Sequence, residues 1–202
     1  MFFNVPPVTR FIIVANALMF LAEMAAGGAI VTPLALWPIG PQFAPWQIVS
    51  YAFLHGSLAH VAFNMFAVYM FGSDLERVWG ARRYLTYYGV SVLSAAAAQL
   101  AFAAFTGAYH PTIGASGGVF GLLLAFALYF PNRTIMLLFP PIPMPAWLFA
   151  TLYGAAELVF GVTGTQAGIA HFAHLGGMLG GYLLIRSGRS HGGPWLRRWK
   201  ST

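Results

Sequence analysis

Long apolar stretches separated by short intervals dominate this chain. The intervals are marked by Gly, Pro, Asn and Ser, and the apolar stretches fall at about 11–30, 58–79, 84–105, 116–130, 145–162 and 170–187. Most of these stretches approach the roughly 20 residues that a helix needs to cross the hydrocarbon core of a bilayer. We therefore predict an all-α polytopic membrane protein with six transmembrane helices, folded as one domain over residues 1–202.

Composition supports a membrane protein over a soluble one. Of the 202 residues, 59% are hydrophobic and only 7% are charged, and the mean hydropathy is +0.72, values that exclude an ordinary soluble domain. The opening residues 1–9 resemble neither a signal peptide nor a transit peptide, so we expect the first apolar stretch to be retained. Cysteine is absent, which excludes disulfides, thiolate metal sites and a cysteine nucleophile.

The basic residues alternate along the chain in a way that predicts orientation. They lie before the first apolar stretch, between the second and third, between the fourth and fifth, and after the sixth: Arg10, Arg77, Arg82, Arg83, Arg133, Arg186, Arg189, Arg197, Arg198 and Lys200. The other connections, 31–57, 106–115 and 163–169, contain no Lys or Arg. The positive-inside rule then places both termini in the cytoplasm. The net charge of +6 is better explained by orientation and anionic lipid than by nucleic acid.

Two connections are unusual. The apolar connection 31–57 contains Trp37 and Trp46, and we expect it to lie partly embedded in the outer interface. The segment from Thr134 to Pro145 contains four prolines, which forbid a continuous helix. We place this second segment along the cytoplasmic surface.

The fourth apolar stretch begins at Ser116 and is too short to cross the membrane. Residues 116–130 would span about 22 Å as a helix, whereas the hydrocarbon core is about 30 Å thick. If Pro131 marks one surface, Ser116 lies several ångströms below the other. The backbone before Ser116 contains Gly107, Pro111 and Gly114, so we expect irregular structure there, which a membrane tolerates only inside protein or beside water.

Polar side chains cluster at the same predicted depth. Stretches two, four and six all begin at the outer face, where the second carries His60 and Asn64 and the sixth carries His171 and His174. A serine hydroxyl becomes a nucleophile when a nearby base takes its proton, and His174 is the best candidate for that base.

Negative charge on an attacked carbonyl would need hydrogen-bond donors. The Ser116 backbone N–H, the Asn64 amide and the His60 imidazole could supply them. Glycines at 114, 117 and 118 would let backbone and substrate approach closely.

Three separated motifs resemble the rhomboid family of intramembrane serine proteases. They are His55-Gly-Ser-Leu-Ala-His60-Val-Ala-Phe-Asn64, Gly114-Ala-Ser116-Gly117, and Ala173-His174-Leu-Gly-Gly177 with Gly181. The resemblance implies a Ser116 nucleophile, a His174 base, oxyanion roles for His60 and Asn64, and a fifth helix that moves aside for a transmembrane substrate. In this resemblance no aspartate completes a catalytic triad, and no metal or cofactor is implied. The expected location is a bacterial cytoplasmic membrane.

The chain departs from the family pattern at two positions. Where the family often has Trp-Arg in the first loop, this chain has Trp46-Gln47, which removes a charge and changes loop anchoring. Where a tyrosine commonly stacks on the catalytic histidine, this chain has Phe120, whose ring can still orient His174 without a hydroxyl contact. Neither change removes a catalytic group, so we expect an active enzyme.

Other polar and small residues have structural explanations. Gly177 and Gly181 form a small-residue pair that we expect to seat the sixth helix against the fourth. His55 and His171 fit cavity-lining or interhelical roles better than direct catalysis. Glu23 and Glu157 lie inside apolar stretches, where an isolated charge costs about 3 kcal/mol on insertion scales, and we expect them to face protein, water or each other. No His-Glu-x-x-His string or acid pair indicates a zinc or aspartyl protease.

Two further functions remain as alternatives. A rhomboid-like binding protein would hold client helices without cutting them, because a fold does not determine a function, but it would need neither Ser116 nor His174. A small channel that moves protons through its histidines would be expected to have matched broken helices in two halves, which this sequence lacks. We therefore favour intramembrane peptide-bond hydrolysis with an acyl-enzyme on Ser116.

Overall fold

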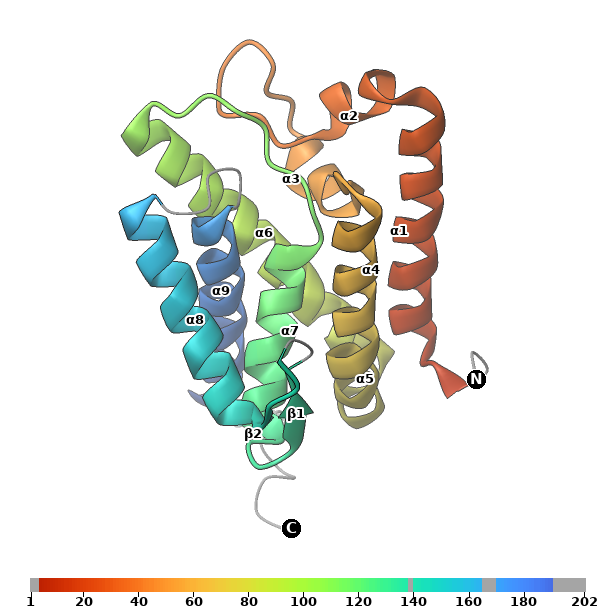
Figure 1. The fold of residues 1–202 in the computed structure, drawn as a ribbon, viewed down its shortest axis with the longest axis vertical. Coiled ribbons are helices and arrows are strands. Elements are labelled where there is room, and N and C mark those ends of the chain that lie inside the picture. Colours follow the sequence, from red (N-terminus) through yellow and green to blue (C-terminus); the bar gives the residue numbers. More distant parts are fainter. Residues whose placement is uncertain (1–3, 138–139, 165–169, 191–202) are drawn as a thin grey trace.

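The computed structural model describes residues 4–137, 140–164 and 170–190, which form an upright helical bundle (Figure 1). The helices are α1 (Pro7–Ala26), α2 (Gly28–Leu34), α3 (Gln47–Ser50), η2 (Tyr51–Phe53), α4 (Leu58–Ala67), η3 (Val68–Gly72), α5 (Ser73–Trp79), α6 (Ala81–Thr106), α7 (Ser116–Tyr129), α8 (Ala146–Thr163) and α9 (His171–Ser190). The predicted tail residues Arg197, Arg198 and Lys200, and most of the connection 163–169, lie outside the described residues.

The predicted helical membrane architecture is confirmed. Among the described residues, α1, α6 and α8 are long and apolar enough to cross a membrane, and α7 is a shorter apolar helix of 14 residues. The predicted stretch 58–79 is one helical run, α4–η3–α5, with a π-helical turn at its centre. The count of six spans stays a prediction.

A short β-hairpin corrects the expectation of a purely helical chain. Strands β1 (Thr134–Met136) and β2 (Pro143–Pro145) pair antiparallel, with Ile135 opposite Met144. The prolines explain the strands, because proline favours extended backbone in the residue before it and cannot continue a helix. Ile135 is buried and joins the core, so the hairpin closes the end of the bundle between α7 and α8 (Figure 1).

The first connection folds over the end of the bundle opposite the hairpin (Figure 1). It contains α2, α3 and η2, and an isolated bridge joins Leu36 to Thr112 in the loop before α7. Gln47 is 1% exposed. Its Oε1 accepts the Trp37 backbone N–H at 3.2 Å, and its Nε2 donates to the Gln42 carbonyl at 2.9 Å. A neutral amide therefore anchors the loop where the family often has arginine.

Glycines allow α7 and α9 to approach closely. A Cβ on Gly177 of α9 would lie 2.0 Å from the Gly117 carbonyl oxygen of α7, so the two backbones touch. Gly181 differs from the expectation, because its nearest neighbours are Tyr87 and Ser91 of α6. The small-residue pair on α9 thus contacts two helices, because α9 packs against both α6 and α7.

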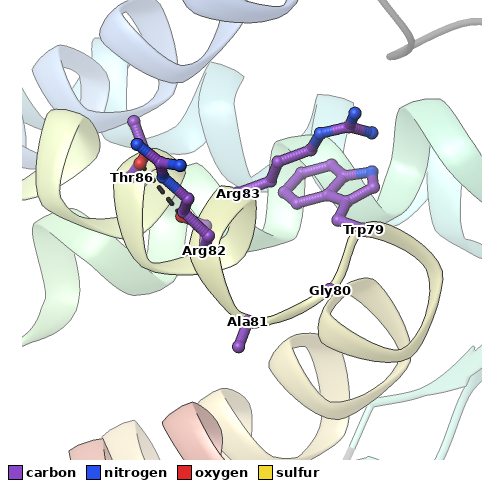
Figure 2. Close-up of a pocket in the computed structure, with 6 residues that line it drawn as sticks. All are labelled: Trp79, Gly80, Ala81, Arg82, Arg83 and Thr86. Atoms are coloured by element: carbon purple, nitrogen blue, oxygen red, sulfur yellow. Dashed lines mark hydrogen bonds between the residues drawn. The ribbon is translucent and has the colours of Figure 1, made fainter.

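Described basic residues gather at the end of the bundle opposite Ser116. Asp74 of α5 pairs with Arg77 and with Arg133, which precedes β1. Figure 2 shows Arg82 and Arg83 at the turn from α5 to α6, with the Arg83 side chain beside the Trp79 indole. The start of α1 and the hairpin lie at this same end (Figure 1). The cytoplasmic orientation of this end stays a prediction.

Candidate active site

Ser116 is the first residue of α7, which is buried along most of its length. The loop before it is held in place because the Gly114 backbone N–H donates to the Tyr51 carbonyl at 2.9 Å, and because Leu36 and Thr112 form their bridge. Gly114 has φ of 126°, which L side chains rarely adopt. Glycine therefore permits the turn that sets Ser116 at the helix start.

His174 reaches Ser116 from α9. Its Nε2 lies 2.7 Å from the Ser116 Oγ, within hydrogen-bond distance, and the residue is 8% exposed. The two side chains are 58 residues apart in sequence and meet because the glycine contact described above brings α7 and α9 together. This geometry suits proton transfer from a hydroxyl to an imidazole.

Phe120 lies one turn after Ser116 and stacks on His174. The ring centroids are 4.3 Å apart and the planes differ by 6°. Phe120 is buried, so its position is fixed by packing as well as by the stack. The contact restricts rotation of the imidazole while leaving both ring nitrogens available for hydrogen bonds.

His60 and Asn64 lie on one face of α4. Together with Ser116 and His174 they line a cavity of about 500 Å³. The Asn64 Nδ2 donates to the His60 carbonyl at 2.9 Å, and the Ser57 Oγ caps the helix by accepting the His60 backbone N–H. A Cβ on Gly114 would lie 3.0 Å from the His60 ring. The structure therefore groups all four polar candidates around one cavity.

The same cavity includes residues that the sequence left without a role. His110 and Thr112 line it from the loop before α7, and Ala170 lines it from the start of α9. His110 stood among loop residues with no motif or periodicity around it, so no sequence signal indicated its place. The loop bridge between Leu36 and Thr112 brings it there.

A second cavity, of about 420 Å³, is mostly apolar and also reaches Ser116. Its walls come from α4, η3, α7, the hairpin and α8, and include Phe63, Met70, Phe120, Phe149 and Tyr153. Ser116 and Asn64 line both cavities. The hydroxyl therefore lies at the junction of a polar chamber and an apolar groove.

A carboxylate lies behind His174, on the side away from Ser116. The Glu157 Oε2 of α8 is 2.9 Å from the His174 Nδ1 and 2.6 Å from the His171 Nδ1. Glu157 and both histidines are buried. The sequence left the roles of Glu157 and His171 open, and the high cost of a charge inside an apolar helix was the only signal that Glu157 has a partner.

Glu157, His171 and His174 also have the composition of a metal site. Their candidate ligand atoms lie within 4.8 Å of one another. Zinc at 2.0–2.2 Å from each ligand would hold neighbouring ligand atoms roughly 3.3 Å apart by tetrahedral geometry. The two separations of 2.6 and 2.9 Å are instead hydrogen-bond distances.

The other intramembrane carboxylate supports the loop that enters α4. Both Glu23 carboxylate oxygens accept the His55 backbone N–H, at 3.1 and 3.2 Å. The His55 ring is buried and meets His60 edge-on, with centroids 4.9 Å apart. Glu23 and Glu157 therefore do not face each other, and each satisfies a different part of the bundle.

A larger hollow, of about 680 Å³, lies at the α5–α6 turn and is unrelated to these residues (Figure 2). Its lining is Trp79, Gly80, Ala81, Arg82, Arg83 and Thr86. It lies toward the end of the bundle that holds the hairpin, away from the start of α7 (Figure 1), and it contains no residue from the three motifs. We therefore take the cavity around Ser116 and His174 as the candidate active site.

Comparisons with known proteins agree on one family. The rhomboid domain model matches residues 42–189. Rhomboid protein 1, mitochondrial, of Saccharomyces cerevisiae is 33% identical over 142 residues, which cover 68% of this chain and 40% of that protein. Rhomboid protease GluP of Bacillus subtilis is 28% identical over 144 residues, 68% of this chain and 25% of that protein.

A further relative is Rhomboid protease GlpG of Salmonella choleraesuis. It is 27% identical over 122 residues, which cover 59% of this chain and 42% of that protein. The chain therefore spans less than half the length of each of these three relatives.

Proposed function

Because the chain belongs to the rhomboid family, we propose that it is an intramembrane serine endopeptidase that cleaves transmembrane segments of membrane proteins. Two of its relatives are named rhomboid proteases. The observation that carries the proposal is the 2.7 Å separation between the Ser116 Oγ and the His174 Nε2. It joins two family motifs from different helices beside one cavity.

In the proposed reaction, Ser116 and His174 form a catalytic pair. The Ser116 Oγ attacks the scissile carbonyl while the His174 Nε2 takes the hydroxyl proton. His174 then gives that proton to the leaving amine, which leaves an acyl-enzyme on Ser116. A water molecule, deprotonated by His174, hydrolyses the ester and regenerates the hydroxyl. The polar cavity beside Ser116 supports access of that water, and the scheme requires no cofactor or metal.

Three donors are proposed to stabilise the oxyanion. The Ser116 backbone N–H belongs to the first turn of α7, where N–H groups have no partner within the helix. The His60 imidazole and the Asn64 amide line the same cavity from α4. Preorganised donors of this kind lower the barrier because they meet charge that develops only in the transition state.

The apolar groove favours a membrane-embedded substrate. A peptide lying between α4 and α8 would have apolar side chains against Phe63, Phe149 and Tyr153 and its scissile bond near Ser116. We propose that α8, as the fifth span, moves aside to admit it. We propose that the product is released toward the outer side, because Ser116 is expected to lie close to that surface of the membrane.

We further propose that residues 1–202 form a single domain of six spans with cytoplasmic termini. The basic end of the bundle supports this orientation, because Arg77 and Arg133 flank Asp74 at the end opposite Ser116. Placement in a bacterial cytoplasmic membrane stays a prediction, since the relatives include bacterial and mitochondrial proteins.

The test is cleavage of a labelled transmembrane substrate by the purified protein in liposomes. We expect the wild-type protein to cleave it and to react covalently with a fluorophosphonate at Ser116. Ser116→Ala should abolish both, and His174→Ala should reduce both by about 10³-fold or more. Ser187→Ala is the matched control, because Ser187 is an exposed serine of α9 whose hydroxyl donates to the Leu184 carbonyl.

A binding protein without protease activity would give a different result. It would capture the substrate with equal affinity in the wild type and in Ser116→Ala, with no cleavage and no fluorophosphonate adduct. Unimpaired cleavage by Ser116→Ala would also contradict the mechanism.

A further inference from the structure

We propose that Glu157 is a positioning residue for His174, so that Ser116, His174 and Glu157 act as a serine–histidine–carboxylate triad. The inference rests on the proposed function of Ser116 and His174. Its basis is a continuous chain of contacts: Ser116 Oγ to His174 Nε2 at 2.7 Å, and His174 Nδ1 to Glu157 Oε2 at 2.9 Å. These contacts connect α7, α9 and α8 in turn.

The first consequence concerns the tautomer of His174. An ionised carboxylate only accepts hydrogen bonds, so the contact with Glu157 requires a hydrogen on Nδ1. The lone pair of a neutral imidazole is then on Nε2, which faces the Ser116 hydroxyl. Without an acceptor at Nδ1, the hydrogen could occupy either nitrogen, and only one of the two tautomers can take the serine proton.

The second consequence concerns charge during the reaction. When the His174 Nε2 takes the Ser116 proton, a positive imidazolium forms in a buried position. Glu157 lies next to that ring, and the attraction between opposite charges is stronger there than in water. Glu157 keeps its negative charge throughout, because the transferred proton stays on Nε2 until it passes to the leaving amine.

His171 holds the carboxylate from the other side. Its Nδ1 is 2.6 Å from the same Glu157 Oε2, so that oxygen meets two imidazole nitrogens. A buried charge is costly unless it is paired and hydrogen-bonded, and the two imidazole nitrogens supply such partners for the Glu157 carboxylate. One turn of α9 thus supplies both the base and a second donor, and Glu157 on α8 connects them.

Phe120 completes the restraint on the base. It packs on the face of the His174 ring, whereas Glu157 lies at the Nδ1 edge and Ser116 at the Nε2 edge. A stack alone permits rotation within the ring plane, and a hydrogen bond at Nδ1 removes that freedom. The chain therefore fixes its histidine with one aromatic contact and one carboxylate.

The experiment compares Glu157→Gln, Glu157→Asp and Glu76→Gln in liposomes. We expect Glu157→Gln to lower kcat by about 10²–10⁴-fold with KM little changed, and to slow fluorophosphonate labelling of Ser116 in parallel. Glu157→Asp keeps the charge with a shorter side chain and should recover part of kcat. Glu76→Gln is the matched control, because Glu76 is also buried but accepts hydrogen bonds from Val8 and Thr9.

The outcomes distinguish a failure of the triad proposal from a failure of the proposed function. Wild-type kcat per folded molecule in Glu157→Gln would overturn the triad and leave the Ser116–His174 mechanism intact. If Glu157→Gln does not fold, Glu157→Asp provides the test. Its shorter side chain moves the carboxylate away from the His174 Nδ1, so a wild-type kcat in this variant would contradict the triad. Activity lost to a chelator and restored by zinc would also overturn the triad, because the cluster would then be a metal site. Substrate cleavage by Ser116→Ala would instead refute the proposed function.

Discussion

The imidazole of His174 lies flat against the phenyl ring of Phe120, with centroids 4.3 Å apart and planes 6° apart. Phe120 follows Ser116 by one helical turn, so the nucleophile and the ring that restrains its base belong to the same rigid element, α7. The family pattern commonly has tyrosine at this position. In this chain the stack is retained without the hydroxyl.

Replacing Phe120 should therefore disturb the orientation of the His174 ring, and lower kcat, more than it lowers the stability of the fold. Aromatic pairs are worth about 0.5–1.5 kcal/mol, which corresponds to roughly 2–10-fold in rate. We expect Phe120→Leu to lower kcat by this amount and Phe120→Tyr to remain close to wild type. Kinetics with the liposome substrate would measure both variants. Phe126→Leu is the control, because the Phe126 ring packs at a tilt against Phe71 and Phe130 instead of stacking on His174.

Asn64 offers a test of the proposed oxyanion donors. Loss of one such donor typically costs about 10²–10³ in kcat, so Asn64→Ala should show this loss with little change in KM. The control is Asn16→Ala, because the Asn16 Nδ2 makes the same local bond, to the Ile12 carbonyl at 2.8 Å, on the remote helix α1. Equal kinetics for the two alanine variants would remove Asn64 from the mechanism.

Contact between two glycines sets the spacing of the helices that carry Ser116 and His174. A Cβ at 177 would lie 2.0 Å from the Gly117 carbonyl oxygen, so Gly177→Ala must push α7 and α9 apart. Overpacking of this kind costs about 1–3 kcal/mol, and we expect a lower Tm together with loss of Ser116 labelling.

Gly89→Ala is the control for that substitution. Apart from the neighbouring backbone of α6 itself, nothing lies within 4 Å of a Cβ at 89, and alanine favours a helix over glycine by up to about 1 kcal/mol. The variant should be as stable as the wild type or more so. A thermal melt monitored by tryptophan fluorescence compares the two, and equal Tm values would mean that the α7–α9 contact does not limit stability.

The parts of this fold that were predictable from sequence are those governed by local physics. Hydropathy located the helices because every backbone polar group in lipid must be satisfied internally, and α6 and α8 begin and end within a few residues of the predicted stretches. The glycines and proline before Ser116 correctly indicated irregular backbone. Three motifs in the right order indicated the family, and with it the pairing of Ser116 with His174.

Features that depend on several helices at once were not predictable. Periodicity does not show which helix a buried Glu157 faces, and its contact with two histidines depends on how α8 packs against α9. The prediction that Gly181 packs against α7 was wrong, because it packs against α6. The sequence does not show which of these two neighbouring helices a small residue on α9 contacts. The hairpin at Ile135 was missed because its strands are only three residues long and rich in proline.

Gln47 tests whether the first loop supports the active site. Its amide accepts from the Trp37 N–H and donates to the Gln42 carbonyl while almost fully buried. Gln47→Leu keeps the approximate size of the side chain but leaves both backbone groups without these partners, at about 1–3 kcal/mol each. The loop also holds Gly114 through the Tyr51 carbonyl, so we expect a lower Tm and a reduced rate of fluorophosphonate labelling. Gln42→Ala should change neither, because only the backbone carbonyl of Gln42 takes part, and equal behaviour of the two variants would show that the loop does not depend on the buried amide.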